Sequence, residues 1–188
     1  MLPLGTTTIL AGPSGSGKST LLKLLAGIEL PDAGKVSLKG QDITFAPALD
    51  RPVAWRPQNA KLYGYLDVVD NVAFSLRSRG CDPDFVSGRV AVALKDMGLT
   101  SIARSFPSQL SSGARERVLM ARLIARQAEL YLIDEPLGGF SIDERKLFLE
   151  ALQRFSSRAG SAVLLASQGL DEMVGEFRVV RISEGRVV

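Results

Sequence analysis

The sequence predicts an α/β fold in which a mostly parallel sheet is covered by helices on both faces. Two continuous apolar runs, at 130–133 and 162–166, are typical of strands that are buried on both sides. A helical pattern spans 143–158 between them. Strands that alternate with helices indicate parallel pairing, because a crossover helix returns the chain to the same edge of the sheet.

The remaining elements follow from apolar periodicity and from breaks at glycine and proline. We expect further strands at 6–11, 36–39, 53–55, 177–182 and 185–188, the last two forming a hairpin-like tail. We expect helices at 19–27 and 114–126, and a helical stretch from 70 to about 98 that Gly80 and Pro83 divide into two pieces.

Composition narrows the classes of protein. The 188 residues are 46% hydrophobic and 23% charged, as in soluble globular proteins, and no apolar run approaches the length of a membrane helix. The first five residues lack the basic and apolar regions of a signal peptide. A net charge of +3 is too small to indicate nucleic-acid binding, so no nucleic acid is expected. The single Cys81 excludes an intramolecular disulfide, and the absence of histidine excludes a histidine base, metal ligand or pH switch.

A glycine-rich segment between the first strand and the first helix matches the pattern G-x-x-x-x-G-K-[ST]. We predict that it binds nucleotide phosphates through Gly12, Pro13, Ser14, Gly15, Ser16, Gly17, Lys18, Ser19 and the following Thr20. The glycines let the backbone curl around an anion, and the helix directs its unpaired N–H groups and positive dipole end at it. Lys18 supplies a charge for the β- and γ-phosphates, and Ser19 offers a hydroxyl to Mg²⁺. Pro13 has no N–H to donate and only shapes the turn.

Two carboxylates follow the apolar run at 130–133. Asp134 and Glu135 stand at the carboxyl end of this strand, where parallel sheets bind their ligands. Acids at a strand end are by themselves common in solvated turns. Beside a phosphate loop, however, Asp134 is a candidate to hold Mg²⁺ through water, and Glu135 is a candidate general base for an attacking water.

Several motifs in order resemble the ATP-binding cassette (ABC) ATPases. Leu110-Ser111-Ser112-Gly113-Ala114 is similar to the family signature LSGGQ, and it opens a helix just before the acidic strand. A helix N-terminus that starts with Ser111, Ser112 and Gly113 can bind an anion, although a simple helix cap would have the same sequence. Gln58 stands where the family has the glutamine that coordinates Mg²⁺ and senses the membrane partner. The segments 58–63 and 69–74 resemble importer-type ATPases for inorganic anions, metals and polyamines.

The resemblance extends from about Gly5 to Val188 and implies one ABC ATPase domain with a P-loop NTPase core. The core would be about 1–70 and 114–188, and an inserted helical subdomain at about 71–113 would contact transmembrane permease subunits. Two ATPase subunits, identical or different, would pair head-to-tail, with each ATP between the phosphate loop of one and the signature of the other. The resemblance also implies a cytoplasmic protein that lies on the inner face of the cell membrane through the permease, with ATP and Mg²⁺ as cofactors.

Two departures from the family concern how ATP is held. Only 11 residues precede Gly12, and none is aromatic, so the strand pair that carries the adenine-stacking residue is missing. Either the start of the chain is misassigned or truncated, or adenine is held differently. The signature reads SSGA, and the Cβ of Ser112 would crowd a close approach to phosphate.

Two further departures concern catalysis. Ser141 falls where the family's SALD segment has aspartate, unless a two-residue shift brings Asp143 there. Gln168 replaces the family's switch histidine; it is a candidate catalytic residue, but glutamine cannot titrate or carry positive charge.

We therefore favour an ATP-hydrolysing transporter subunit that dimerises on ATP. The alternative is a degenerate cassette that binds ATP and a partner but hydrolyses poorly, because altered groups at a site usually cost rate before binding. An ABC ATPase of DNA repair or translation is disfavoured, since the chain has neither coiled-coil arms nor a second cassette.

Overall fold

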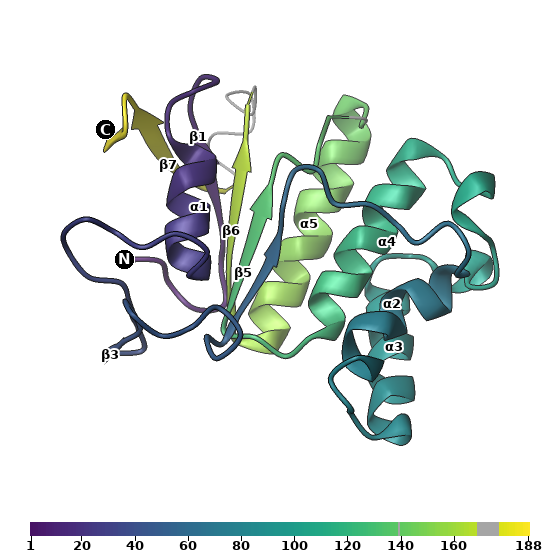
Figure 1. Cartoon of the computed structure of the whole chain (residues 1–188). Helices are drawn as coiled ribbons and strands as arrows, with labels where there is room; N and C mark the ends of the chain where they lie inside the picture. The colour runs from purple at the N-terminus through teal and green to yellow at the C-terminus, as the bar shows by residue number, and fades with distance from the viewer. Residues whose placement is uncertain (139, 169–176) are drawn as a thin grey trace.

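The computed structural model describes every residue except 139 and 169–176, and it contains a six-stranded sheet with helices on both sides (Figure 1). The elements in chain order are β1 Thr7–Ala11, α1 Lys18–Ala26, β2 Ser37–Leu38, β3 Gln41–Asp42, β4 Val53–Arg56, α2 Val68–Arg77, α3 Pro83–Asp96, the short 3₁₀ turns Thr100–Ile102 and Pro107–Gln109, α4 Ser112–Ala125, β5 Leu130–Asp134, α5 Ile142–Ala159, β6 Ala162–Ser167, β7 Arg178–Ser183 and β8 Arg186–Val187.

The sheet confirms the predicted parallel architecture. Its strand order is β4-β5-β6-β1-β7-β8, and every neighbouring pair is parallel except the hairpin β7–β8. The first strand of the chain lies near the middle of the sheet, so the loop that follows β1 begins at the same edge as the carboxyl ends of β5 and β6. Strands β2 and β3 form a separate two-stranded sheet.

Neighbouring residues of the central strands pack into two hydrophobic clusters on opposite faces. Leu132 and Leu164 belong to the cluster that contains Leu22 of α1. The adjacent Ile133 and Leu165 belong to the cluster that α4 and α5 complete. Figure 1 shows α1 on one side of the sheet and α5 and α4 on the other. This two-sided burial explains why the strands are apolar without alternation.

Side-chain caps decide where the helices begin. Asp67 accepts a hydrogen bond from the N–H of Asp70, so α2 starts at Val68, two residues before the predicted start. Asp82 and Pro83 begin α3 after the predicted break. Helices α2 and α3 pack against each other and against α4, and all three contribute to the larger hydrophobic cluster.

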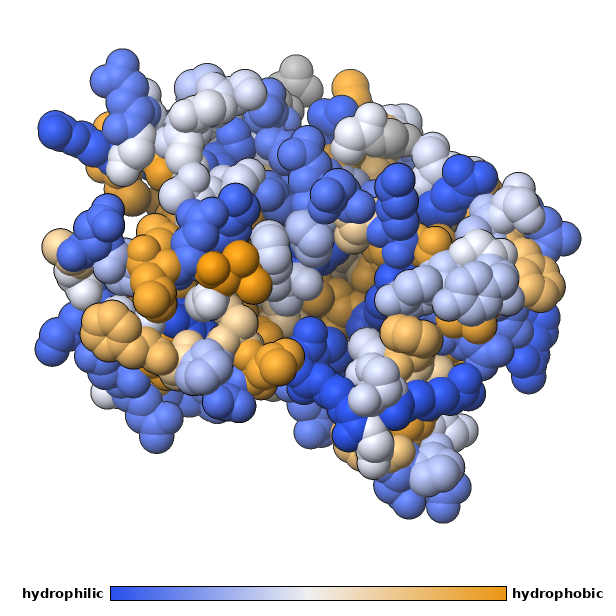
Figure 2. Space-filling model, viewed as in Figure 1, coloured by the Kyte–Doolittle hydropathy of each residue, from blue (hydrophilic) through white to orange (hydrophobic). Residues whose placement is uncertain are grey.

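The segment between α1 and β4 exposes several apolar side chains. Ile28, Leu30, Phe45 and Leu49 lie between α1 and β4 and are 52% to 82% exposed. In Figure 2 hydrophobic surface is visible on the left of the molecule, where these elements lie. Within the described part of the chain, no helix is both long enough and apolar enough to cross a membrane.

Candidate nucleotide-binding site

The loop between β1 and α1 has the backbone that its glycines permit. Gly15 and Gly17 have φ of 77° and 99°, in the left-handed region that favours glycine. A Cβ on Gly12 would lie 2.3 Å from the carbonyl oxygen of Ile182 in β7, so no other residue fits there. Pro13, Ser14 and Gly15 are exposed at the tip, whereas Ser16 is buried. The loop is therefore an open cradle with a buried base.

Lys18 lies at the centre of this cradle and is only 6% exposed. Its Nζ donates hydrogen bonds to the carbonyl oxygens of Gly12, at 2.7 Å, and Pro13, at 2.9 Å. The same Nζ lies 3.8 Å from Oε1 of Glu135, which is an ion pair but too long for a hydrogen bond. Pro13 thus contributes an acceptor as well as the turn shape that its sequence predicted.

The two acids lie side by side at the end of β5 but have different surroundings. Asp134 is 4% exposed, and its Oδ1 has no hydrogen-bond partner among the residues that the structure describes. Glu135 has a φ of 45°, and its N–H donates to the carbonyl oxygen of Ala166 in β6. Its Oε2 accepts a hydrogen bond of 3.3 Å from the backbone N–H of Gln168. The turn after β5 thus places the Glu135 carboxylate between Lys18 and the chain that leaves β6.

The arrangement fits a magnesium nucleotide. Mg²⁺ prefers oxygen ligands, and the buried Asp134 Oδ1 offers one that the described residues leave unpaired. The buried Ser16 Oγ in the loop is unpaired in the same sense. Ser19 lies in the first turn of α1, directly after Lys18, and Thr20 follows on the exposed side. A buried polar atom without a partner is costly, so these oxygens mark positions suited to a polar ligand.

Gln58 reaches the same edge of the sheet from another strand. It is exposed and stands two residues beyond β4, whose Arg56 is in register with Ile133 of β5. The carboxyl ends of β4 and β5 are therefore neighbours. Gln58 is the third predicted magnesium residue, and its exposed side chain lies beyond the end of its strand, in a turn.

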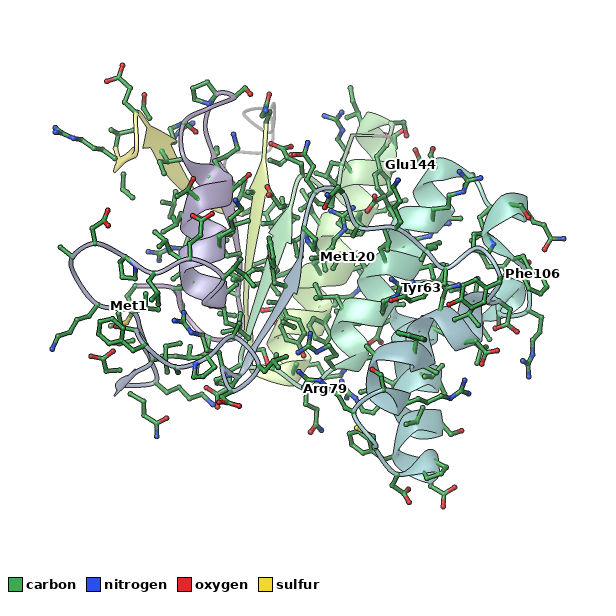
Figure 3. The ribbon with its side chains drawn as sticks, in the orientation of Figure 1. Met1, Tyr63, Arg79, Phe106, Met120 and Glu144 are labelled. Carbon is green, nitrogen blue, oxygen red and sulfur yellow. The ribbon has the colours of Figure 1, made fainter. Side chains whose placement is uncertain are left out.

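The signature-like segment lies apart from the phosphate loop. Ser111 caps α4 by accepting a hydrogen bond from the N–H of Ala114, so the helix begins at Ser112, two residues before the predicted start. Gly113 is buried, and a Cβ there would lie 3.2 Å from Oε1 of Glu144, which Figure 3 places near one end of α5. In Figure 1, β5 and β6 separate α4 from α1. One chain therefore does not place its own signature on its own phosphate loop.

Comparison with protein families agrees with this geometry. The family model described as ABC transporter matches residues 1–138, which is most of the chain. The chain belongs to this family. The relatives that it matches are named as import ATP-binding proteins, in agreement with the importer-type resemblance of the segments 58–63 and 69–74.

Three relatives illustrate the similarity to ABC import proteins. The chain is 35% identical over 97% of its length to a sulfate/thiosulfate import ATP-binding protein CysA of Thermosynechococcus vestitus, and covers 55% of that protein. It is 35% identical over 97% of its length to a spermidine/putrescine import ATP-binding protein PotA of Nitrosomonas europaea, and covers 51% of it. It is 36% identical over 98% of its length to a probable CysA of Chlorella vulgaris, and covers 78% of it. The chain thus spans about half the length of the first two of these relatives.

Among the positions that depart from the ABC pattern, Ser141 has a defined structural role. Ser141 caps α5: its Oγ accepts from the N–H of Glu144, and the Glu144 carboxylate accepts from the N–H of Ser141. The Glu144 carboxylate also accepts from the Ser141 hydroxyl, and the two bonds that it accepts from Ser141 lower the pKa of Glu144. Asp143 is exposed in the first turn of α5. Gln168 is exposed and meets Glu135 through its backbone N–H, a contact that any residue except proline could make.

Two features of this ABC site were missed from the sequence. Arg56, the last residue of β4, is buried and forms an ion pair with Glu116 of α4. Burial lowers the pKa of Arg56 and raises that of Glu116, although each partner opposes the shift of the other. A charged residue at the end of an apolar strand was the available signal. The second feature is a hydrogen bond from the N–H of Gly185 to the carbonyl oxygen of Ser16. It depends on the pairing of β7 with β1, so no local sequence pattern could predict it.

Proposed function

We propose that this protein is the ATP-binding and ATP-hydrolysing subunit of an ABC importer. The observation that carries the proposal is the cluster of Lys18, Glu135 and the unpaired Asp134 Oδ1 at one edge of the sheet, in a chain of the ABC family. Lys18 would bind the β- and γ-phosphates in place of its loop carbonyls. Glu135 would accept the proton of the attacking water, because its carboxylate is fixed by the turn after β5.

Ser19, Gln58 and Asp134 would hold Mg²⁺, which when bound neutralises charge on the phosphates. The backbone N–H groups of the loop and the start of α1 would orient the phosphates. The burial of Lys18 and Asp134 would strengthen their electrostatic contacts, because the site excludes much of the water around them.

We further propose that two subunits, identical or different, pair head-to-tail. The separation of α4 from α1 within one chain supports this arrangement, since Ser111, Ser112 and Gly113 would then serve the phosphate loop of the other subunit. Binding of ATP would close the pair, and hydrolysis would reopen it.

The membrane partner would be a pair of permease subunits. A cleft of about 460 Å³ opens between the segment after Gln58 and the start of α4. It is lined by Ala60, Lys61, Leu62, Pro107, Ser108, Ser112, Arg115, Glu116 and Leu119. In Figure 3 Tyr63 and Phe106 lie on the same helical side of the molecule. We propose that this cleft, between the core and the helical subdomain at about 71–113, receives a permease segment and holds the protein on the inner face of the cell membrane.

The deciding experiment is steady-state phosphate release by the purified protein, with and without its permease subunits. An importer ATPase should hydrolyse ATP and change its rate when the permease is present. Binding of Mg-ATP without turnover in either condition would instead support the degenerate cassette. Relatives named for sulfate/thiosulfate and for spermidine/putrescine match equally well, as expected if cargo is chosen by other subunits.

Gln168→His is expected to raise turnover by at least about tenfold, or ~1.4 kcal/mol of barrier. An imidazole could carry positive charge as negative charge shifts in the transition state, and positioned groups of this kind contribute about 10²–10⁴ in rate. The backbone bond to Glu135 would remain in the variant, so the base stays in place. ATP affinity should change little, because the gain belongs to the transition state.

Phosphate release measures this effect, and calorimetry measures the affinity. An unchanged rate would mean that Gln168 does not occupy the switch position or that another departure limits turnover. Ser141→Asp, added to Gln168→His, separates these two explanations: a rise only in the double variant would identify Ser141 as limiting.

A further inference from the structure

The buried pair of Arg56 and Glu116 links the nucleotide site to the signature helix. Arg56 is 4% exposed at the end of β4. Its Nη1 donates a hydrogen bond of 2.7 Å to the backbone carbonyl oxygen of Asp134. Its Nη2 donates to both carboxylate oxygens of Glu116, each at 2.5 Å. One guanidinium group thus bonds both the end of β5 and the helix α4.

The groups that Arg56 bonds belong to the proposed magnesium site and to the helix that carries the signature segment. Asp134 is the proposed magnesium aspartate, and Arg56 donates to the backbone carbonyl of Asp134 itself rather than to that of a neighbouring residue. Glu116 lies one helical turn after Ser112, in the helix that Ser111 caps. Gln58 stands two residues beyond Arg56. The Arg56 side chain, at the end of β4, therefore lies between the proposed magnesium site and the signature segment.

The chemistry of arginine suits this double contact. Its planar guanidinium holds its N–H groups in a fixed fork, so it can donate in two directions at once, which a lysine ammonium does with less definite geometry. The Glu116 side chain is 21% exposed and Arg56 far less, so each charge depends on the other for compensation. The link is therefore both directional and difficult to break while the two elements remain packed.

We propose that Arg56 and Glu116 are positioning residues that hold the signature segment of α4 in register with the magnesium aspartate of the same subunit. The inference rests on the proposed ATPase function. A subunit that lacks the link would bind Mg-ATP at its own phosphate loop as well as before. It would present Ser111, Ser112 and Gly113 to a partner subunit in a less fixed orientation, so closure of the pair and hydrolysis would suffer.

The test replaces the ion pair with an apolar pair, Arg56→Met together with Glu116→Leu. Apolar residues of similar volume often replace a buried ion pair without loss of stability, so this variant keeps the packing and removes the link. We expect its thermal unfolding to stay close to wild type, and its KM and calorimetric affinity for Mg-ATP to stay within about twofold. We expect kcat to fall by about tenfold, which corresponds to ~1.4 kcal/mol of barrier. In a Glu135→Gln background, light scattering should show that ATP-dependent pairing needs about tenfold more protein.

Single variants and a surface control complete the design. Glu116→Gln keeps the shape of the side chain but removes its charge, so it should also lower kcat. It provides the test if the apolar variant does not fold. The matched control is Glu29→Gln, which removes the carboxylate of the exposed pair with Lys23 and should leave every readout unchanged.

The outcomes separate the inference from the function on which it rests. A folded apolar variant with wild-type kcat and wild-type pairing would overturn the inference and show that the pair only packs. The inference is overturned equally if the apolar variant does not fold and Glu116→Gln keeps wild-type kcat. A wild-type protein that neither hydrolyses ATP nor pairs would overturn the proposed function itself.

Discussion

Glu135→Gln is expected to lower ATP hydrolysis by about 10²–10⁴-fold, the contribution typical of a positioned general base. The amide has the size of the carboxylate but cannot accept the proton of water. It leaves Lys18 and Asp134 in place, so Mg-ATP should still bind and should hold two subunits together. Phosphate release measures the loss of turnover, and light scattering with ATP should report a dimer that persists.

The control for this variant is Glu129→Gln, just before the other end of β5. Glu129 pairs with Lys39 near the surface, far along the strand from the nucleotide edge, so its loss should leave turnover unchanged. Full hydrolysis by Glu135→Gln, with a monomer at all concentrations, would exclude Glu135 as the base. Equal losses in both variants would point to a general weakening of the strand.

Much of the core was predictable because its signals are local. The phosphate loop lies within eight residues, from Gly12 to Ser19, and the predicted helix starts have a capping side chain or a glycine nearby. Asp134 and Glu135 follow an apolar run whose burial on both faces the structure confirms. Parallel sheets bind their ligands at the carboxyl ends of the strands. Both acids could therefore be assigned to the site before the strand order was known.

The contacts that could not be predicted join residues far apart in the chain. Arg56 and Glu116 are 60 residues apart, and no local sequence pattern around either residue predicts that they pair. The same holds for the approach of Ile182 to Gly12, which depends on β7 lying beside β1. Periodicity identifies strands but not their order, so such contacts emerge only when the sheet is assembled.

The signature segment illustrates an intermediate case. Its residues were assigned from their order along the chain, and the cap at Ser111 follows from its residue type. Its distance from the phosphate loop of the same chain could not be derived from spacing alone, because the position of α4 depends on its packing against α2, α3 and β4. The role of the segment toward a second subunit remains a prediction.

Lys18→Ala is expected to weaken Mg-ATP binding severely. In the described structure the Lys18 ammonium bonds two carbonyl oxygens and lies 3.8 Å from Glu135, so its charge is held inside the loop. Charge-assisted hydrogen bonds contribute ~1.5–3 kcal/mol each, so losing even one contact to phosphate should raise the Kd by roughly ten- to a hundredfold. The alanine variant also leaves the Gly12 and Pro13 carbonyls without this donor, which should loosen the loop before nucleotide arrives.

Calorimetry with Mg-ATP measures this effect, and Lys23→Ala is its matched control. Lys23 lies on the same helix, but its side chain is 40% exposed and pairs with Glu29, so its loss removes an equal charge from the protein without touching the loop. A similar fall in affinity for both variants would mean that net charge, rather than the loop contact, attracts the nucleotide. Wild-type affinity in Lys18→Ala would contradict the assignment of the phosphate loop, because no other group described inside the cradle carries a positive charge that could replace Lys18.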